Sequence, residues 1–157
     1  MTQAIQSLQE GDRAPAFTLI SDSGEKISLK DFKGQTVILY FYPKDMTPGC
    51  TQESCDFRDS FSAFKKAKAA IFGISRDSVE RHRKFKEKYS LPFALLSDED
   101  GKVCEAYGVW KEKSLYGRKF MGIERTTFVV GPDGKIAKVF SKVKVKGHVS
   151  AVLADCK

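Results

Sequence analysis

Apolar residues form continuous runs in some segments of the chain and a stripe with helical spacing in another. Two apolar runs without polar alternation, residues 36–42 and 69–75, predict strands that are buried on both faces. A stripe of Phe57, Phe61 and Phe64, at spacings of four and three, predicts a helix over residues 50–68. The same criteria predict the remaining elements: a hairpin of 17–19 and 26–29, a helix ending at 89, a strand at 91–96, a short helix at 101–107, a hairpin of 126–130 and 135–140, and a weakly helical tail at 148–153.

Strands and helices alternate in the middle of the chain, between an N-terminal hairpin and a second hairpin near the C-terminus. Asp77 followed by Glu80 resembles a capping box, which would open the helix that ends at residue 89. Alternating strands and helices indicate a partly parallel sheet covered on both faces. We therefore expect an α/β fold of the thioredoxin-like type: a central mixed sheet flanked by helices, with an N-terminal hairpin extension. No linker or repeat divides the sequence, so residues 1–157 are expected to form one domain.

The composition is typical of a globular protein, with 41% hydrophobic and 30% charged residues. The longest apolar run, residues 37–42, is far shorter than the roughly 18 residues that cross a bilayer. Residues 1–12 have neither a basic region nor an apolar core, so they do not resemble a secretory signal. We therefore expect a cytoplasmic protein without a membrane partner.

The net charge of +7 raises the question of an acidic partner. Most of the lysines and arginines are mixed with acidic residues, which is typical of a solvated helix face. The exceptions are the clusters at 111–119 and 142–146. In the second cluster the lysines of KVKVK alternate, which favours a protected edge strand. A nucleic-acid groove would also contain interleaved aromatic residues, so we expect no nucleic-acid partner.

Four cysteines allow three alternatives in a reducing compartment: buried fillers, metal ligands or redox-active thiols. Cys50 falls at a predicted helix start, where unpaired N–H groups and the macrodipole favour the reactive thiolate. It precedes Phe57 by seven residues, about two turns, so its side chain is expected to face the core. Cys104 is expected to fill the core, and Cys156 lies next to the end of the sequence.

Cys55 follows Cys50 by five residues, which turns a helix by about 500° and separates the two Cα atoms by about 8.6 Å. A disulfide requires Cα atoms closer than about 7 Å. If these two cysteines pair, the first turns of the helix must therefore unwind. A spectator thiol remains the alternative for Cys55.

The loop and helix around Cys50 carry a signature that spans several residues. Pro43, Thr47 and Cys50 match the PxxxTxxC spacing of the peroxiredoxins. The stretch YFYPKDMTPGCTQESCDFRD at 40–59 resembles the Q-type peroxiredoxins, also called bacterioferritin comigratory proteins. Three further segments extend this resemblance over nearly the whole chain: GDRAPAFTL, LKDFKGQTVILYFYP and ERTTFVVGPDGKI.

The resemblance implies a thiol peroxidase that reduces hydrogen peroxide and organic hydroperoxides. Cys50 would be the peroxidatic cysteine that becomes a sulfenic acid, and Cys55 the resolving cysteine that forms a disulfide with it. Thr47 would bond the thiolate and the peroxide, and Pro43 would shield the site from water. Arg125 would stabilise the thiolate and polarise the peroxide. The resemblance also implies a monomer recharged by thioredoxin or a similar dithiol, with no metal or organic cofactor.

Two other functions remain open from the sequence alone. A metal-binding or metal-delivery module of thioredoxin-like fold would use Cys50, Cys55 and a histidine as ligands for copper or zinc. Against it, a spacing of five places two ligands poorly on one helix, and Arg125 would repel a cation. A nucleic-acid or chaperone-type protein would rely on the net charge of +7. Two further expectations are that His82 lies at the boundary of the core and that Trp110 lines a groove near the site.

Overall fold

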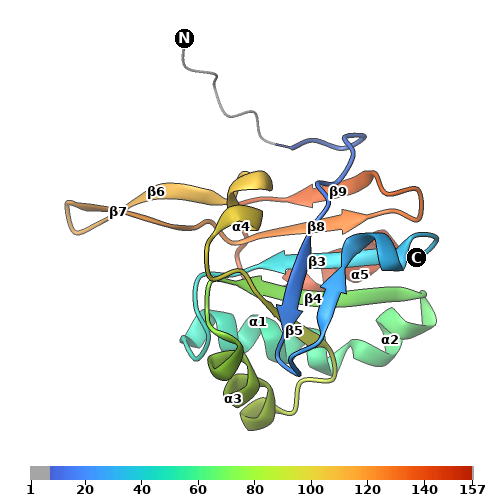
Figure 1. Cartoon of the computed structure of the whole chain (residues 1–157), viewed down its shortest axis with the longest axis horizontal. Coiled ribbons are helices and arrows are strands. Elements are labelled where there is room, and N and C mark those ends of the chain that lie inside the picture. Colours follow the sequence, from blue (N-terminus) through green and yellow to red (C-terminus); the bar gives the residue numbers. More distant parts are fainter. Residues whose placement is uncertain (1–7, 157) are drawn as a thin grey trace.

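A mixed sheet of seven strands forms the centre of the computed structural model, which describes residues 8–156 (Figure 1). The strand order is β2-β1-β5-β4-β3-β8-β9. The three central strands β3, β4 and β5 run parallel, and the other neighbouring pairs are antiparallel. The strands are β1 (Thr18–Ser21), β2 (Lys26–Ser28), β3 (Thr36–Phe41), β4 (Ala69–Ser75), β5 (Ala94–Ser97), β8 (Thr126–Val130) and β9 (Ile136–Phe140).

Helices cover both faces of this sheet, and the alternation of residues along β3 explains why. Ile38 and Tyr40 point into a core shared with α1, α2, α3 and α5, whereas Leu39 and Phe41 point into a core shared with α4 and the 3-10 helix η1. The continuous apolar run from Val37 to Phe41 is therefore buried on both sides of the sheet, as predicted. The helices are η1 (Leu29–Phe32), α1 (Pro48–Asp59), α2 (Phe61–Lys66), α3 (Val79–Tyr89), α4 (Lys102–Ala106) and α5 (His148–Cys156).

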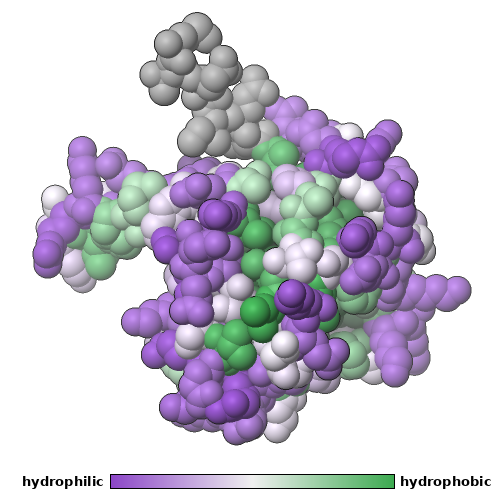
Figure 2. Space-filling view, in the orientation of Figure 1, coloured by the Kyte–Doolittle hydropathy of each residue, from purple (hydrophilic) through white to green (hydrophobic). Residues whose placement is uncertain are grey.

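Two further strands, β6 (Trp110–Leu115) and β7 (Arg118–Ile123), form an antiparallel hairpin that projects from the body (Figure 1). The sequence patterns do not predict this hairpin, because it carries the basic cluster at 111–119 and buries few residues. Figure 2 shows hydrophobic side chains along it among polar ones. The exposed large hydrophobic residues of the hairpin are Leu115, Tyr116, Phe120 and Met121.

The mixed sheet, the flanking helices and the N-terminal hairpin of the sequence prediction are confirmed. The single helix predicted over residues 50–68 is wrong in two respects. The helical segment runs from Pro48 to Lys66, and it is divided into α1 and α2 at Ser60. Phe57 and Phe64 nevertheless pack into the same core. The apolar stripe therefore continues across the break, which is why the pattern did not reveal it.

Three smaller predictions also need correction. Ser78, not Asp77, caps α3, because its side chain accepts a hydrogen bond from the N–H of Arg81. The lysines at 142–146 lie in the connection between β9 and α5 and not on an edge strand. The strand expected at 91–96 begins later, at Ala94. Part of the N-terminal segment 1–12, namely residues 1–7, lies outside the described residues. Over residues 8–156, every helix is too short or too polar to span a bilayer.

Candidate active site

Cys50 lies in the first turn of α1, where the loop after β3 meets the helix. Thr47 is the N-cap residue, and Pro48 takes the first helical position, where its missing N–H leaves no hydrogen bond unmade. Cys50 is 1% exposed and shares a core cluster with Phe57 and Phe64, so the predicted core-facing orientation is confirmed. The sulfur is thus held at the helix end whose unpaired N–H groups and dipole favour negative charge.

Arg125 reaches this sulfur from the segment between β7 and β8. Its Nη2 donates to Cys50 Sγ at 3.2 Å, and its Nη1 donates to Glu53 Oε1 at 2.6 Å. A guanidinium does not lose its charge at physiological pH, so this contact stabilises a thiolate. Gly49 permits the approach, because a Cβ at this position would lie only 3.2 Å from Nη2 of Arg125.

Glu53 is a site residue that the sequence reasoning missed. Its side chain is 0% exposed and lies beneath the guanidinium of Arg125. Burial raises the pKa of this carboxyl to about 7, although the adjacent charge of Arg125 opposes the shift. Glu53 follows Cys50 by three residues, which places the two side chains on one helix face. That spacing is the signal that could have identified it.

His148, the first residue of α5, closes the far side of the Glu53 carboxylate. Its Nε2 lies 3.9 Å from Glu53 Oε2 and forms a hydrogen bond of 2.8 Å with the hydroxyl of Thr127. Burial, and then the charge of Arg125, lower the pKa of His148 to about 4. The imidazole is therefore neutral at pH 7 and supplies no charge to Glu53. Within residues 8–156, Glu53 Oε2 has no hydrogen-bond partner.

Thr47 does not cap α1 with its side chain. Its hydroxyl instead donates to the carbonyl oxygen of Lys44 at 2.8 Å, within the loop between β3 and α1. Because the hydrogen is committed to Lys44, the hydroxyl oxygen presents lone pairs and can accept a hydrogen bond from a bound molecule. The backbone between them includes Met46 with a positive φ of 69°, which tightens the loop.

A cleft of about 460 Å³ opens beside this loop, between it and the β6–β7 hairpin. Pro43 and Trp110 both line it, so the expected position of Trp110 in a groove near the site is confirmed. Lys113 lines it as well, and burial together with the charge of Arg125 lowers the pKa of this lysine. The cleft is thus bordered by positive charge close to the Cys50–Arg125 contact.

The other three cysteines occupy different environments. Cys55 lies on the same unbroken helix as Cys50 and is half-buried, and burial raises its pKa. Cys104 is 0% exposed within the core, as expected. Cys156 is half-buried on α5, and burial raises its pKa to about 11. All four are free thiols.

Within residues 8–156, one cluster of three side chains could hold a metal ion: Asp45, Asp77 and His82. Neither Cys50 nor Cys55 belongs to this group, so the geometry offers no support for a metal module built on the two cysteines and a histidine. His82 is also more deeply placed than predicted. It is 0% exposed and not at the boundary of the core.

A buried cysteine sulfur at a helix start, in contact with a guanidinium and on a sheet of this topology, is typical of thiol peroxidases of thioredoxin-like fold. Comparisons with known proteins agree with this class. The AhpC/TSA family model matches residues 10–139. The putative peroxiredoxin bcp of Coxiella burnetii is 56% identical over 147 residues, which cover 94% of this chain and 97% of that protein. Peroxiredoxin Bcp of Bacillus subtilis is 51% identical over 151 residues, 96% of each chain.

Solved structures give the same result. A structure of the bacterioferritin comigratory protein of Xanthomonas campestris, studied for alkyl peroxide reduction, superimposes with a TM-score of 0.88. It is 42% identical and covers 94% of this chain and 97% of that one. The chain belongs to the AhpC/TSA family and, within it, to the peroxiredoxins of the Bcp or Q type. It is a thiol-dependent peroxidase, and the resemblance drawn from the sequence is confirmed.

Proposed function

We propose that Cys50 is the peroxidatic residue of this peroxidase. Its thiolate attacks one peroxide oxygen, the O–O bond breaks, and the second oxygen leaves as water or an alcohol after taking up a proton. The sulfur is oxidised to a sulfenic acid. The observation that carries this proposal is the 3.2 Å contact of Arg125 Nη2 with the buried sulfur at the start of α1.

Arg125 and Thr47 act on the peroxide in this proposal. The guanidinium stabilises the thiolate before the attack and meets the negative charge that develops on the leaving oxygen. The Thr47 hydroxyl, whose hydrogen is directed at Lys44 O, accepts a hydrogen bond from the peroxide O–H and so orients the O–O bond. Pro43 lines the cleft beside the loop, and in this proposal it limits the access of water to Cys50.

Cys55 resolves the sulfenic acid. Its thiolate attacks the oxidised sulfur of Cys50, the S–O bond breaks, water leaves and a disulfide forms. Because α1 carries both cysteines without a break, its first turns must unwind before the two sulfur atoms can meet. Thioredoxin or a similar dithiol then reduces the disulfide by exchange.

The remaining parts of the proposal concern substrate, location and assembly. Hydrogen peroxide and organic hydroperoxides are the proposed substrates, and the related protein studied for alkyl peroxide reduction supports the second class. We propose a cytoplasmic location, because a reducing compartment keeps the thiols of the cycle available. We also propose that the protein acts as a monomer. Residues 1–157 act as one domain, without nucleic acid, membrane, metal or organic cofactor. Strands near both ends of the chain share one sheet, which supports a single domain.

A coupled assay with thioredoxin, thioredoxin reductase and NADPH tests the proposal. Peroxide-dependent NADPH oxidation is expected, and Cys50→Ser should abolish it. Undiminished turnover by this variant would refute the role of Cys50. Peptide mapping after one equivalent of peroxide should show Cys50 linked to Cys55. A link from Cys50 to Cys104, or between two chains, would refute the resolving role of Cys55 and leave the role of Cys50 unaffected.

A further inference from the structure

Asp45 is a buried acid in the loop that delivers Cys50, five residues before it in the sequence. Its side chain is 0% exposed, although a buried carboxylate is strongly unfavourable unless it is paired. The loop must therefore contain a reason for this burial. Neither the proposed chemistry nor the family signature uses Asp45.

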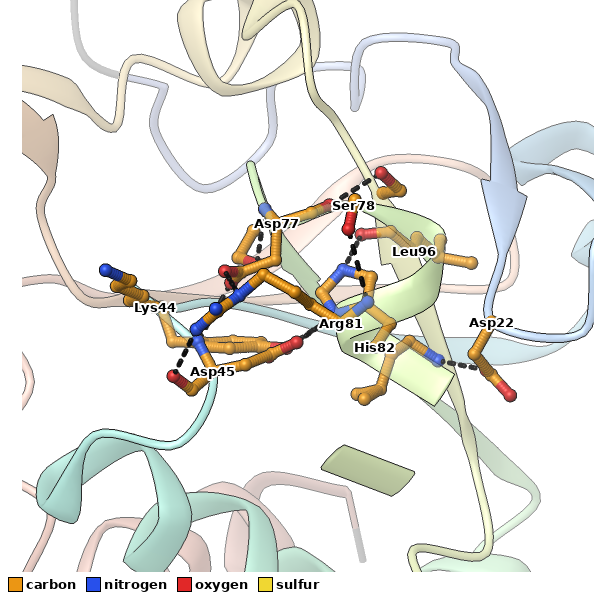
Figure 3. A network of polar contacts seen from close by, with 12 residues as sticks. Asp22, Lys44, Asp45, Asp77, Ser78, Arg81, His82 and Leu96 are labelled. Atoms are coloured by element: carbon orange, nitrogen blue, oxygen red, sulfur yellow. Dashed lines mark hydrogen bonds and ion pairs between the residues drawn. The ribbon is translucent and has the colours of Figure 1, made fainter. Parts of the chain in front are cut away.

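Two side chains satisfy the Asp45 carboxylate (Figure 3). The hydroxyl of Tyr42 donates to Oδ1 at 2.5 Å, and Nδ1 of His82 lies 2.6 Å from Oδ2. The other ring nitrogen of His82, Nε2, lies 3.0 Å from the carbonyl oxygen of Leu96. A carbonyl oxygen can only accept, so Nε2 carries a hydrogen.

This assignment fixes the charge of the Asp45–His82 pair. With Nε2 protonated, the short Nδ1–Oδ2 contact holds one further proton, either on the ring or on the carboxyl group. In both arrangements the pair has no net charge, which explains how both side chains can be fully buried. Because His82 lies on α3 and Leu96 on β5, the loop is tied to two elements of the rigid body.

Asp77 holds the same loop through its backbone. Its Oδ2 accepts the N–H of Asp45 at 2.8 Å, and Oδ1 accepts from Arg81 Nε at 3.0 Å. The N–H of Asp45 and the carbonyl of Lys44 belong to one planar peptide unit, so fixing one end fixes the direction of the other. The carbonyl of Lys44 is the acceptor for the hydroxyl of Thr47.

We propose that Asp45 and Asp77, together with His82, are positioning residues for the peroxide reaction: they fix the Lys44–Asp45 peptide and, through it, the hydroxyl of Thr47. The inference rests on the proposed role of Thr47. It does not depend on a ligand at the Asp45–Asp77–His82 cluster, since the hydrogen bonds described above already engage its oxygen and nitrogen atoms.

The test measures the second-order rate constant for oxidation of Cys50 by peroxide, using rapid quenching and alkylation of the remaining thiol. Asp45→Ala should lower this rate constant about tenfold or more, as expected for a misplaced orienting group. Asp45→Asn should stay within about threefold of the wild type, because the amide can accept from Tyr42 and donate to a neutral His82. Wild-type rates for Asp45→Ala would overturn the proposal.

A double-mutant cycle separates positioning from general loss of structure. In a Thr47→Val background, Asp45→Ala should cost less than about threefold, since the group that it positions is already absent. Equal losses in both backgrounds would overturn the route through Thr47. If Asp45→Ala does not fold, Asp77→Ala takes its place in the same cycle, because it removes the acceptor for the Asp45 N–H, together with the bonds from Ser75 and Arg81, and keeps the buried Asp45–His82 pair. A full rate for Thr47→Val alone would overturn the role of Thr47 and this inference, while leaving the Cys50→Ser test untouched.

Asp22 provides a matched control, because it contacts the two elements to which the loop is tied, α3 and β5 (Figure 3). Its carboxylate, 7% exposed, accepts the N–H of Leu95 on β5 and pairs with Lys86 on α3, but it makes no contact with the loop. Asp22→Ala should lower the thermal midpoint and leave the rate constant within about twofold of the wild type. A loss as large as that of Asp45→Ala would show that rigidity in general, and not the loop, is responsible, and would overturn the proposal.

Discussion

Protonation of Glu53 should control how easily the first turns of α1 unwind. In the folded helix this carboxyl is fully buried, and its pKa is raised to about 7, largely by burial. When α1 unwinds, Glu53 meets water and its pKa returns to the ordinary value of 4.5. A raised pKa in the folded helix means that protonation favours folding. The stabilisation is complete below about pH 4.5 and is lost as the pH rises to about 7.

The magnitude follows from these two values. Between about pH 5.5 and about pH 8, linkage predicts that the helix start loses about 2 kcal/mol of stability against unwinding. That change corresponds to a roughly thirtyfold rise in the fraction of molecules in which the first turns of α1 are unwound. Other titratable groups face Glu53 or Arg125. The pKa of His148 is lowered to about 4, below this range, and burial raises the pKa of Tyr40 above it. Asp56, which is half-buried, lies near Glu53, whereas Cys50 and Lys113, whose pKa is lowered, lie near Arg125.

Amide hydrogen exchange of α1, corrected for intrinsic rates, measures this opening in the reduced protein. Protection of the α1 amides should fall with pH relative to the amides of α3, which serve as an internal reference. Glu53→Gln should remove the pH dependence and keep an acceptor for Arg125. Equal pH dependence in the wild type and in Glu53→Gln would refute the assignment to Glu53.

Two further outcomes can be checked in the same protein. Arg125→Lys should slow oxidation of Cys50 by about ten- to a hundredfold, because an ammonium cannot contact the sulfur and Glu53 through a planar fork. Stopped-flow kinetics measure this rate, and a value within about twofold of the wild type would contradict the role of Arg125 in stabilising the thiolate. Cys104→Ala should lower the free energy of unfolding by about 1 kcal/mol, since it removes a fully buried sulfur. Denaturant titration checks this value, and turnover and the Cys50–Cys55 linkage should not change.

The elements that the sequence predicted well include those whose apolar residues form a continuous run. Strands β3 and β4 are apolar at nearly every position and could be recognised without tertiary information. The β6–β7 hairpin could not, because it projects from the body and its residues pack against few partners. The break at Ser60 also escaped detection, since the apolar stripe serves the same core on both sides of it.

The residues of the candidate site that are close in sequence could be predicted, whereas those whose burial depends on distant residues could not. Cys50 and Thr47 are close in sequence, and a spacing motif identifies them. Glu53 shares a helix face with Cys50, but its burial depends on Arg125, which is brought against it from a distant segment. His82 was expected at the core boundary for the same reason. Its burial depends on Asp45, which lies thirty-seven residues away.

The two acids on either side of Cys50 lead us to expect that α1 unwinds while the loop before it stays in place. Asp45 is buried with both carboxylate oxygens bonded, and its loop is tied to α3 and β5. Glu53 is buried with one oxygen that has no partner among residues 8–156, so its burial opposes the folded helix. Unwinding of α1 relieves that cost, whereas displacement of the loop would create a new one. We therefore expect oxidation to melt the helix from Cys50 toward Cys55, and reduction to return Cys50 to a Thr47 that has not moved.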